Sequence, residues 1–200
     1  MTNGIIFDLD GVLVDAADWH YQALNEALAV FGYAPIGRED HLARFNGLPT
    51  RDKMKLLGIT QPLAGIIDRV KQVYTRRIIR AQARPDYAKL MLLYELRKHY
   101  ALAVASNART ASVIEMLDAT GIDVRLFEVI MGGDQVQRAK PAPEIYQSVC
   151  RELGADPDEC VVVEDSEPGL QAAQAAGCRV IQVQSFAEVN AQLFKREKLL

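Results

Sequence analysis

The stretch "GIIFDLDGVLVD" (residues 4–15) joins a strongly apolar run to two closely spaced acids. Ile5, Ile6 and Phe7 follow one another without a polar residue between them, which is typical of a strand buried on both faces. Asp8 and Asp10 come directly afterwards, and like charges so close together repel each other unless something neutralises them. The stretch therefore predicts the first strand of a parallel sheet, with an acidic site at its carboxyl end.

Five segments share this apolar, β-branched character and predict strands: residues 4–9, 101–106, 127–131, 160–164 and 179–183. The segments between them show the 3–4 residue spacing of amphipathic helices, and Gly121, Gly154 and Gly177 mark three expected helix ends. Strands that alternate with helices predict the α/β class, with a doubly wound parallel sheet in a Rossmann-like core.

One interval lacks any strand pattern. Between residues 16 and 83 the sequence shows a helical stripe (Leu24, Ala27, Leu28, Phe31) and further helical stretches near residues 51–57 and 63–81. Glycine and proline punctuate these stretches. We therefore expect a Rossmann-like core formed by residues 1–15 and 84–200, and an inserted α-helical cap domain formed by residues 16–83.

Composition and hydropathy argue against several classes of protein. The formal net charge of the 200 residues is −3, so no basic surplus exists to neutralise the phosphates of a nucleic acid. The three cysteines lack metal-ligand spacing and are interpreted as reduced thiols. No signal peptide and no apolar run of the ~20 residues that span a bilayer is visible. We expect a cytoplasmic monomer that binds neither nucleic acid nor a membrane.

Polar groups follow the predicted strands where parallel sheets bind their ligands, beyond the carboxyl ends. They are Asp8, Asp10, Ser106, Asn107, Glu164 and Asp165, with Lys140 before the helix that leads to the fourth strand. Clustered carboxylates need a cation, and a ligand set made only of oxygen atoms favours Mg²⁺. Hydroxyl, backbone N–H and ammonium donors suit phosphate oxygens. An aspartate can also act as a nucleophile, so the combination predicts phosphoryl transfer.

Each signal also has an ordinary structural explanation. Asp10-Gly11 could form an ordinary hairpin turn, and Ser106-Asn107 could be a helix N-cap. Lys140 could be a surface lysine, and Glu164-Asp165 could be acids at a helix N-terminus. The functional interpretation is favoured because all four signals occur in one chain.

The segments "FDLDGVLVD", "VASNAR", "RAKPAPEIY" and "VVVEDSEPG" resemble, in this order, the four motifs of the haloacid dehalogenase superfamily. The chain is most similar to the branch that contains beta-phosphoglucomutase and small sugar phosphatases, which have a helical cap after the first motif. The resemblance covers essentially all 200 residues.

The resemblance implies a nucleophile and a general acid/base, namely Asp8 and Asp10. It implies that the transferring phosphoryl group is bound by Ser106, Asn107 and Lys140, and that Lys140 also neutralises charge during catalysis. The implied Mg²⁺ ligands are Asp8, the backbone carbonyl of Asp10, Asp165 and, directly or through water, Glu164.

In the cap, the resemblance implies substrate contacts from His20, Gly47 and Arg51. A solvent-exposed helix histidine and a solvated charge cluster are equally good explanations of these residues. Arg76, Arg77 and Arg80 are interpreted as a polar helix face.

The expected function is a Mg²⁺-dependent phosphatase that hydrolyses a small phosphorylated metabolite, a sugar phosphate, through an aspartyl-phosphate. A phosphomutase with the same motifs is the main alternative. A signalling receiver domain is disfavoured, because it is about half this length and its phospho-acceptor follows the third strand, whereas Asp134 lies several residues beyond that strand here. A binding protein without catalysis is disfavoured by the complete set of acids.

Overall fold

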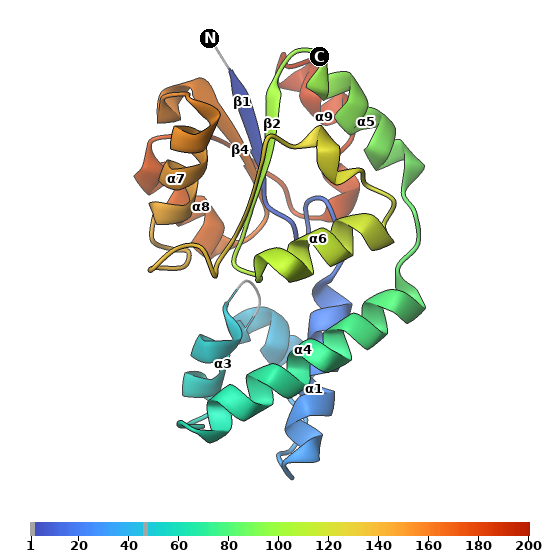
Figure 1. The fold of residues 1–200 in the computed structure, drawn as a ribbon, viewed down its shortest axis with the longest axis vertical. Coiled ribbons are helices and arrows are strands. Elements are labelled where there is room, and N and C mark those ends of the chain that lie inside the picture. The colour runs from blue at the N-terminus through green and yellow to red at the C-terminus, as the bar shows by residue number, and fades with distance from the viewer. Residues whose placement is uncertain (1–2, 46–47) are drawn as a thin grey trace. The chain divides into compact units, whose positions relative to one another are not determined.

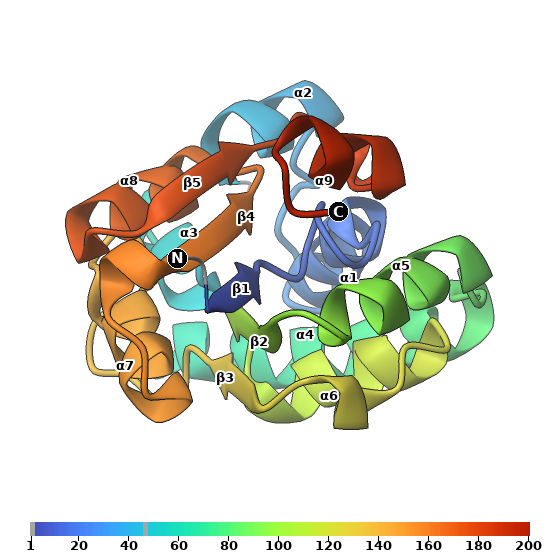
Figure 2. The same ribbon diagram turned by 90° about the horizontal axis from the view of Figure 1, so that it is seen from above.

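The computed structural model describes residues 3–45 and 48–200. Five parallel strands form one sheet in the order β3-β2-β1-β4-β5 (Figures 1 and 2). They are β1 (Gly4–Phe7), β2 (Ala101–Ser106), β3 (Val129–Gly132), β4 (Cys160–Glu164) and β5 (Arg179–Gln182). The predicted α/β class with a doubly wound parallel sheet is thereby confirmed.

Three strands were predicted to extend beyond their observed bounds, and for two of them the physical reason is clear. The first strand ends at Phe7 rather than at residue 9, because the Leu9 carbonyl accepts hydrogen bonds from the backbone N–H groups of Leu13 and Val14 and the chain turns there. The third strand begins at Val129 rather than at residue 127, because Phe127 closes the short helical turn η2 (Val124–Leu126). The fifth strand also ends one residue early, at Gln182.

Helices cover both faces of the sheet (Figure 2). One face packs against α7 (Glu144–Leu153) and α8 (Glu167–Ala176), and the other against α5 (Tyr87–Arg97), α6 (Thr110–Ala119) and α9 (Ala191–Arg196). Two short turns, η3 (Pro157–Glu159) and η4 (Phe186–Glu188), complete the elements. Gly154 and Gly177 have left-handed backbone conformations just after α7 and α8, as expected of helix C-caps.

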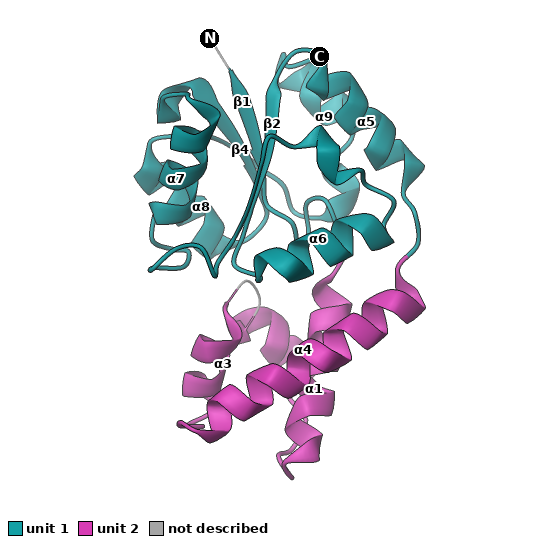
Figure 3. Ribbon diagram, in the orientation of Figure 1, with its two compact units in different colours: residues 1–15, 84–200 teal, residues 16–83 magenta. Residues whose placement is uncertain are grey.

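The chain divides into two compact units, residues 1–15 with 84–200 and residues 16–83 (Figure 3). The second unit contains α1 (Ala17–Val30), α2 (Arg38–Asp40), a π-helical turn η1 (His41–Phe45), α3 (Thr50–Leu56) and α4 (Leu63–Gln82). No strand lies in the described part of this unit. Helices α1 and α4 pack together and are tied by an ion pair between Arg77 and Glu26.

The unit formed by residues 16–83 has an apolar core of its own. Its buried members come from α1, η1, α3, α4 and the loops between them: Leu24, Ala27, Leu28, Ile36, Phe45, Met54, Ile59, Ala64 and Ile67. Among all described residues, no helix is both long and apolar enough to cross a membrane.

Candidate active site

Strand register brings the ends of three central strands together. Phe7 of β1 lies opposite Val104 of β2 and Val163 of β4. One residue further on, the backbone N–H of Asp8 donates to the Val163 carbonyl (3.0 Å). Asp8 therefore emerges between the last residues of β2 and β4, which are Ser106 and Glu164.

A tight turn follows Asp8, and Gly11 is essential to its shape. Gly11 has a φ of +82°, and its N–H donates to the Val14 carbonyl (2.8 Å). A Cβ atom at this position would lie 2.1 Å from Oδ2 of Asp165. A glycine is thus needed here both for the left-handed backbone and for the close approach of an acidic side chain.

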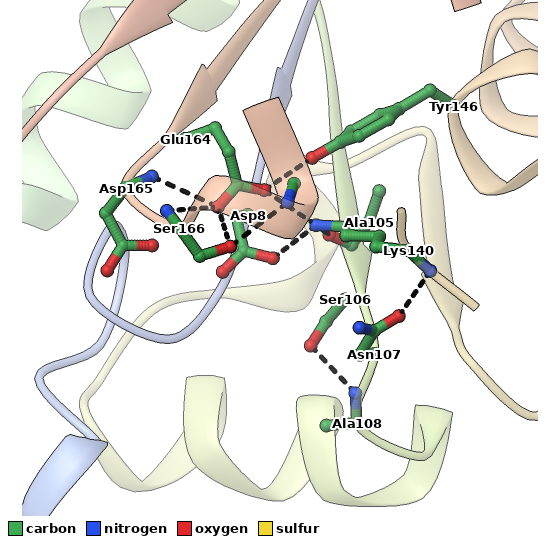
Figure 4. A network of polar contacts seen from close by, with 11 residues as sticks. Asp8, Ala105, Ser106, Asn107, Ala108, Lys140, Tyr146, Glu164, Asp165 and Ser166 are labelled. Carbon is green, nitrogen blue, oxygen red and sulfur yellow. Dashed lines mark hydrogen bonds and ion pairs between the residues drawn. The ribbon is translucent and has the colours of Figure 1, made fainter. Parts of the chain in front are cut away.

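Lys140 is the centre of the charge network in Figure 4. Its side chain is almost completely buried, and Nζ donates to Asp8 Oδ1 (2.5 Å), Glu164 Oε2 (2.9 Å) and the Ala105 carbonyl (2.9 Å). All three hydrogens of the ammonium group therefore have acceptors. Lys140 is therefore not a surface lysine, which was the ordinary structural explanation of this residue.

Glu164 is fully buried and both of its carboxylate oxygens accept hydrogen bonds. Oε2 accepts from Lys140 and from the Tyr146 hydroxyl (2.7 Å), and Oε1 accepts from Ser166 Oγ (2.9 Å) and from the backbone N–H groups of Ser166 (2.9 Å) and Asp165 (3.1 Å). The Ser166 side chain also caps α8 through the Gly169 N–H. Glu164 is thereby held rigidly between Lys140 and the start of α8.

The buried charges perturb one another strongly. Burial alone would lower the pKa of Lys140, but Asp8 and Glu164 raise it well above its usual value. Burial would likewise raise the pKa of Glu164, but Lys140 holds it below its usual value. The pKa of Asp8 is raised well above its usual range, by burial and then by the charge of Glu164, despite the opposing effect of Lys140. One lysine is therefore insufficient to neutralise these acids.

Asp165 adds to this excess of negative charge. Burial, and then the charge of Glu164, raise the pKa of Asp165 to about 7. Asp8, Glu164 and Asp165 each offer a carboxylate oxygen within 4.8 Å of the others. The cluster fits a hard divalent cation, because its donors are oxygen atoms and their repulsion needs a positive charge.

Ser106 and Asn107 lie beside this network (Figure 4). The Ala108 N–H donates to Ser106 Oγ (3.0 Å), and the Lys140 N–H donates to Asn107 Oδ1 (3.0 Å). Neither residue is the N-cap of α6, which is Arg109. Asn107 thus positions the backbone of Lys140, and the Ser106 hydroxyl can still donate its own proton.

The other predicted residues lie in different surroundings. Asp10 is half-buried in the turn after β1 and pairs with Val14 in an isolated bridge. Asp134 accepts from the Thr110 N–H and hydroxyl (both 2.8 Å), so it stabilises the start of α6. In the unit of residues 16–83, His20 is half-buried on α1 and Arg51 is exposed on α3, whereas Gly47 lies outside the described residues.

Sequence reasoning missed Tyr146 and Ser166. Tyr146 is one of the buried side chains on α7, where its spacing from Val149 and Cys150 indicates packing, yet its hydroxyl donates to Glu164 and its ring centre lies 4.7 Å from Lys140 Nζ. A buried tyrosine hydroxyl generally requires a polar partner, and this was the available signal. Ser166 stands directly after the predicted acids, as an N-cap residue typically does.

Comparison with known proteins identifies the family. Residues 5–183 match the haloacid dehalogenase-like hydrolases. The chain is 31% identical over 177 residues to the "Phosphorylated carbohydrates phosphatase" of Thermotoga maritima, covering 86% of this chain and 81% of that protein. It is also 31% identical over 193 residues to "Protein SUPPRESSOR OF QUENCHING 1, chloroplastic" of Arabidopsis thaliana. That match covers 92% of this chain but only 18% of the longer Arabidopsis protein.

A solved structure agrees with these matches. A variant of CbbY from Rhodobacter sphaeroides, in complex with xylulose-(1,5)bisphosphate, has a TM-score of 0.81 and 28% identity, covering 94% of this chain and 96% of that chain. The resemblance found in the four sequence motifs is therefore confirmed. The chain belongs to the haloacid dehalogenase-like hydrolase family, and it is an enzyme of that family's phosphatase kind.

Proposed function

We propose that this enzyme hydrolyses a small phosphorylated metabolite, a sugar phosphate, through an aspartyl-phosphate on Asp8. The observation that carries the proposal is the buried contact of Lys140 Nζ with Asp8 and Glu164. This contact holds one oxygen of Asp8 in place and so keeps the Asp8 carboxylate at the carboxyl end of β1. The similar Thermotoga maritima protein is named for phosphorylated carbohydrates, and the CbbY structure holds a sugar bisphosphate, which supports the substrate class.

In the proposed first step, an Asp8 oxygen attacks phosphorus while the bond between phosphorus and the alkoxide oxygen of the substrate breaks. Asp10 gives its proton to that leaving oxygen. In the second step, Asp10 takes a proton from water and the water oxygen attacks phosphorus. The bond between phosphorus and the Asp8 oxygen breaks, which releases inorganic phosphate and regenerates the Asp8 carboxylate. Lys140 offsets negative charge on Asp8, and Ser106 and Asn107 bind the phosphoryl oxygens.

The acidic cluster would hold Mg²⁺ through Asp8, Asp165 and the backbone carbonyl of Asp10. The bound ion would supply positive charge to the phosphoryl oxygens and to the crowded carboxylates. Glu164 would act through water, because protein donors already occupy both of its oxygens. The chain's own residues thus supply the nucleophile, the proton donor and the buried lysine.

The unit formed by residues 16–83 is proposed to be the cap, with His20, Gly47 and Arg51 contacting the substrate. Closure of such a cap would exclude bulk water from the reacting groups. The three cysteines are free and buried, which supports a reducing compartment, and we propose a cytoplasmic location.

The test is turnover of p-nitrophenyl phosphate with Mg²⁺ by the Asp8→Asn variant. We expect a loss of at least about 10³-fold in kcat, because the nucleophile is removed. The matched control is Asp158→Asn, an exposed acid before the amino end of β4, which should leave turnover unchanged. Equal turnover by Asp8→Asn and the unaltered enzyme would refute the assignment.

A phosphomutase would use the same residues but would return the phosphoryl group to a second hydroxyl of the sugar. Incubation with a sugar monophosphate and a catalytic amount of a bisphosphorylated sugar separates the two reactions. Hydrolysis predicts inorganic phosphate equal to the monophosphate consumed, whereas conversion of the monophosphate into its isomer without phosphate release would replace the hydrolase proposal.

A further inference from the structure

The loop that follows β3 lies directly against the segment that follows β2. Ser106 is paired with Gly132 at the ends of these two strands, so the residues after them are neighbours. We call residues 133–143, which join β3 to α7, the β3–α7 loop. At its start, the Gly133 N–H donates to the Ala108 carbonyl (2.8 Å). The loop therefore begins in contact with the backbone that follows Ser106.

Asp134, the second residue of this loop, binds the first residue of α6. Its Oδ1 accepts hydrogen bonds from the Thr110 N–H and from the Thr110 hydroxyl (both 2.8 Å). The hydroxyl oxygen in turn accepts from the Gly132 N–H (3.2 Å). Arg109, the N-cap residue of α6, makes no side-chain capping bond, so Asp134 supplies the acceptor from another part of the chain. The start of α6 is therefore attached to the end of β3.

The contact at Gly133 is too close for any larger residue. A Cβ atom at this position would lie 2.7 Å from the carbonyl oxygen of Asn107 and 3.3 Å from its Cα atom. Gly133 does not have a positive φ, so its backbone conformation would suit other residues. A glycine is needed here because the loop packs against the backbone of Asn107.

These contacts extend to the hydroxyl group of Ser106. The carbonyl of Ala108 accepts from Gly133, and the N–H of Ala108 donates to Ser106 Oγ (3.0 Å). Figure 4 shows this bond to Ser106 beside the buried Lys140. Because one lone pair of Ser106 Oγ is occupied by Ala108, the position of Ala108 limits the directions in which the hydroxyl can donate its proton.

The other end of the β3–α7 loop contacts the same segment. The Lys140 N–H donates to Asn107 Oδ1 (3.0 Å). Glu144, the first residue of α7, fixes the middle of the loop by accepting from the backbone N–H groups of Gln137 (2.7 Å) and Arg138 (3.2 Å). One loop thus holds the Asn107 segment at two points and also carries the buried lysine.

We propose that Asp134 is a positioning residue, which holds the Ser106–Asn107 segment in place for the phosphoryl group through its bonds to Thr110. The inference rests on the proposed function, because it needs Ser106 and Asn107 to bind phosphoryl oxygens. Asp134 itself is exposed and does not contact the phosphoryl group in this proposal. A binding group displaced by about 1 Å can lower a rate by about 10²-fold, whereas the loss of a helix cap alone lowers only stability.

The test compares Asp134→Ala with the unaltered enzyme in two measurements. Calorimetry with Mg²⁺ gives the Kd of inorganic phosphate, and steady-state kinetics gives kcat and KM for p-nitrophenyl phosphate. We expect the phosphate Kd to rise by about tenfold and kcat to fall by about tenfold, because the Ser106 hydroxyl loses its fixed direction. Asp134→Asn should keep both values within about twofold, since both bonds end on one oxygen and an asparagine Oδ1 accepts the same two bonds.

The matched control is Asp123→Ala. Asp123 is likewise an acidic cap, which accepts from the Arg125 N–H (2.9 Å) at the start of η2, before the amino end of β3. Its loss should lower stability to urea but leave the phosphate Kd and kcat unchanged. If Asp134→Ala behaved like this control, with lower stability and unchanged phosphate affinity and kcat, Asp134 would be a structural cap only and the proposal would be overturned.

A double variant tests the route of the effect. If Asp134 acts through the segment that carries Ser106, the Ser106→Ala/Asp134→Ala variant should weaken phosphate binding by less than the product of the two single effects. Full multiplication of the two effects would contradict the proposal. Phosphate affinity is measured without turnover, so this failure differs from failure of the hydrolase proposal, which would appear as normal turnover by Asp8→Asn.

Discussion

Tyr146 stabilises the charge network through a single hydroxyl group. That hydroxyl donates to Glu164, which in turn holds Lys140 against Asp8. We expect Tyr146→Phe to lower the free energy of unfolding by about 1–3 kcal/mol, because a buried carboxylate loses a donor. As a positioning residue it should also lower kcat several-fold with little change in KM. Urea unfolding and steady-state kinetics measure both effects.

The matched control for Tyr146→Phe is Tyr87→Phe, because Tyr87 is exposed on α5. It should change neither stability nor kcat. A Tyr146→Phe variant with unchanged kcat and unchanged stability would show that the hydroxyl is dispensable for the network.

Replacement of Asp165 by asparagine should stabilise the metal-free protein but weaken its binding of Mg²⁺. Its pKa of about 7 lies above the usual value of 3.8, so its charged form is disfavoured in the folded chain and its contribution to stability falls as the pH rises from about 4 to about 7. In metal-free buffer at pH 8, Asp165→Asn should therefore stabilise the protein by about 1–3 kcal/mol. The same variant should lose Mg²⁺ uptake in calorimetry.

The control for this prediction is Glu167→Gln, an exposed acid in the first turn of α8. It should leave both Mg²⁺ uptake and metal-free stability nearly unchanged. Mg²⁺ binding by Asp165→Asn with unchanged affinity would remove Asp165 from the proposed ligand set.

The charged residues of the site were visible in the sequence because strand ends can be located from apolar runs. Asp8 directly follows one such run, and Glu164 is the last residue of another. Parallel strands bring their carboxyl ends to the same edge of the sheet. The contribution of Tyr146 was hidden, because a tyrosine in a helical stripe is first assigned to packing. Which donors hold each Glu164 oxygen depends on side-chain geometry that spacing alone does not determine.

At the scale of elements, Gly169 allows α8 to begin directly against Glu164. A Cβ atom at this position would lie 1.9 Å from Oε2 and 2.5 Å from Oε1 of that carboxylate. Glu164 cannot move aside easily, because several donors hold it. Gly169→Ala should therefore destabilise the chain by about 1–3 kcal/mol through overpacking, even though alanine favours helices. Chemical denaturation measures the loss.

The control for Gly169→Ala is Gln174→Ala, an exposed position later in α8, where alanine should be neutral or slightly stabilising. A Gly169→Ala variant as stable as this control would mean that the Glu164 carboxylate is free to shift.

The elements most easily predicted are those with long, uniform patterns. The bounds of β2 and β4 agree with the sequence-based ranges, because each strand is an unbroken apolar run that ends at a polar residue. The elements α2 and η1 were not predicted. Their segment "REDHLARF" is short and mostly polar, and its two buried side chains, His41 and Phe45, are too few to show a period.

At the scale of the whole molecule, each of the two compact units has its own apolar cluster, so each has its own sources of stability. In the unit of residues 16–83, the buried His41 links stability to pH. In the folded chain its pKa is about 4, lowered first by burial and then by nearby positive charges, against 6.5 in the unfolded chain. The unfolded state therefore binds more protons between these two values, and stability must fall as the pH drops.

The expected loss is on the order of 3 kcal/mol between pH 6.5 and pH 4, and it should be absent above pH 7, where His41 is neutral in both states. The free energy of unfolding of the full chain, measured with urea, should therefore change less between pH 7.5 and pH 5 for His41→Gln than for the unaltered protein. The other titratable groups contribute equally in the two proteins. His99→Gln, at an exposed position, should keep the full difference. If His41→Gln and His99→Gln lost the same stability on acidification, His41 would have to be accessible to protons in the folded chain, and burial and nearby positive charge would not hold its imidazole neutral.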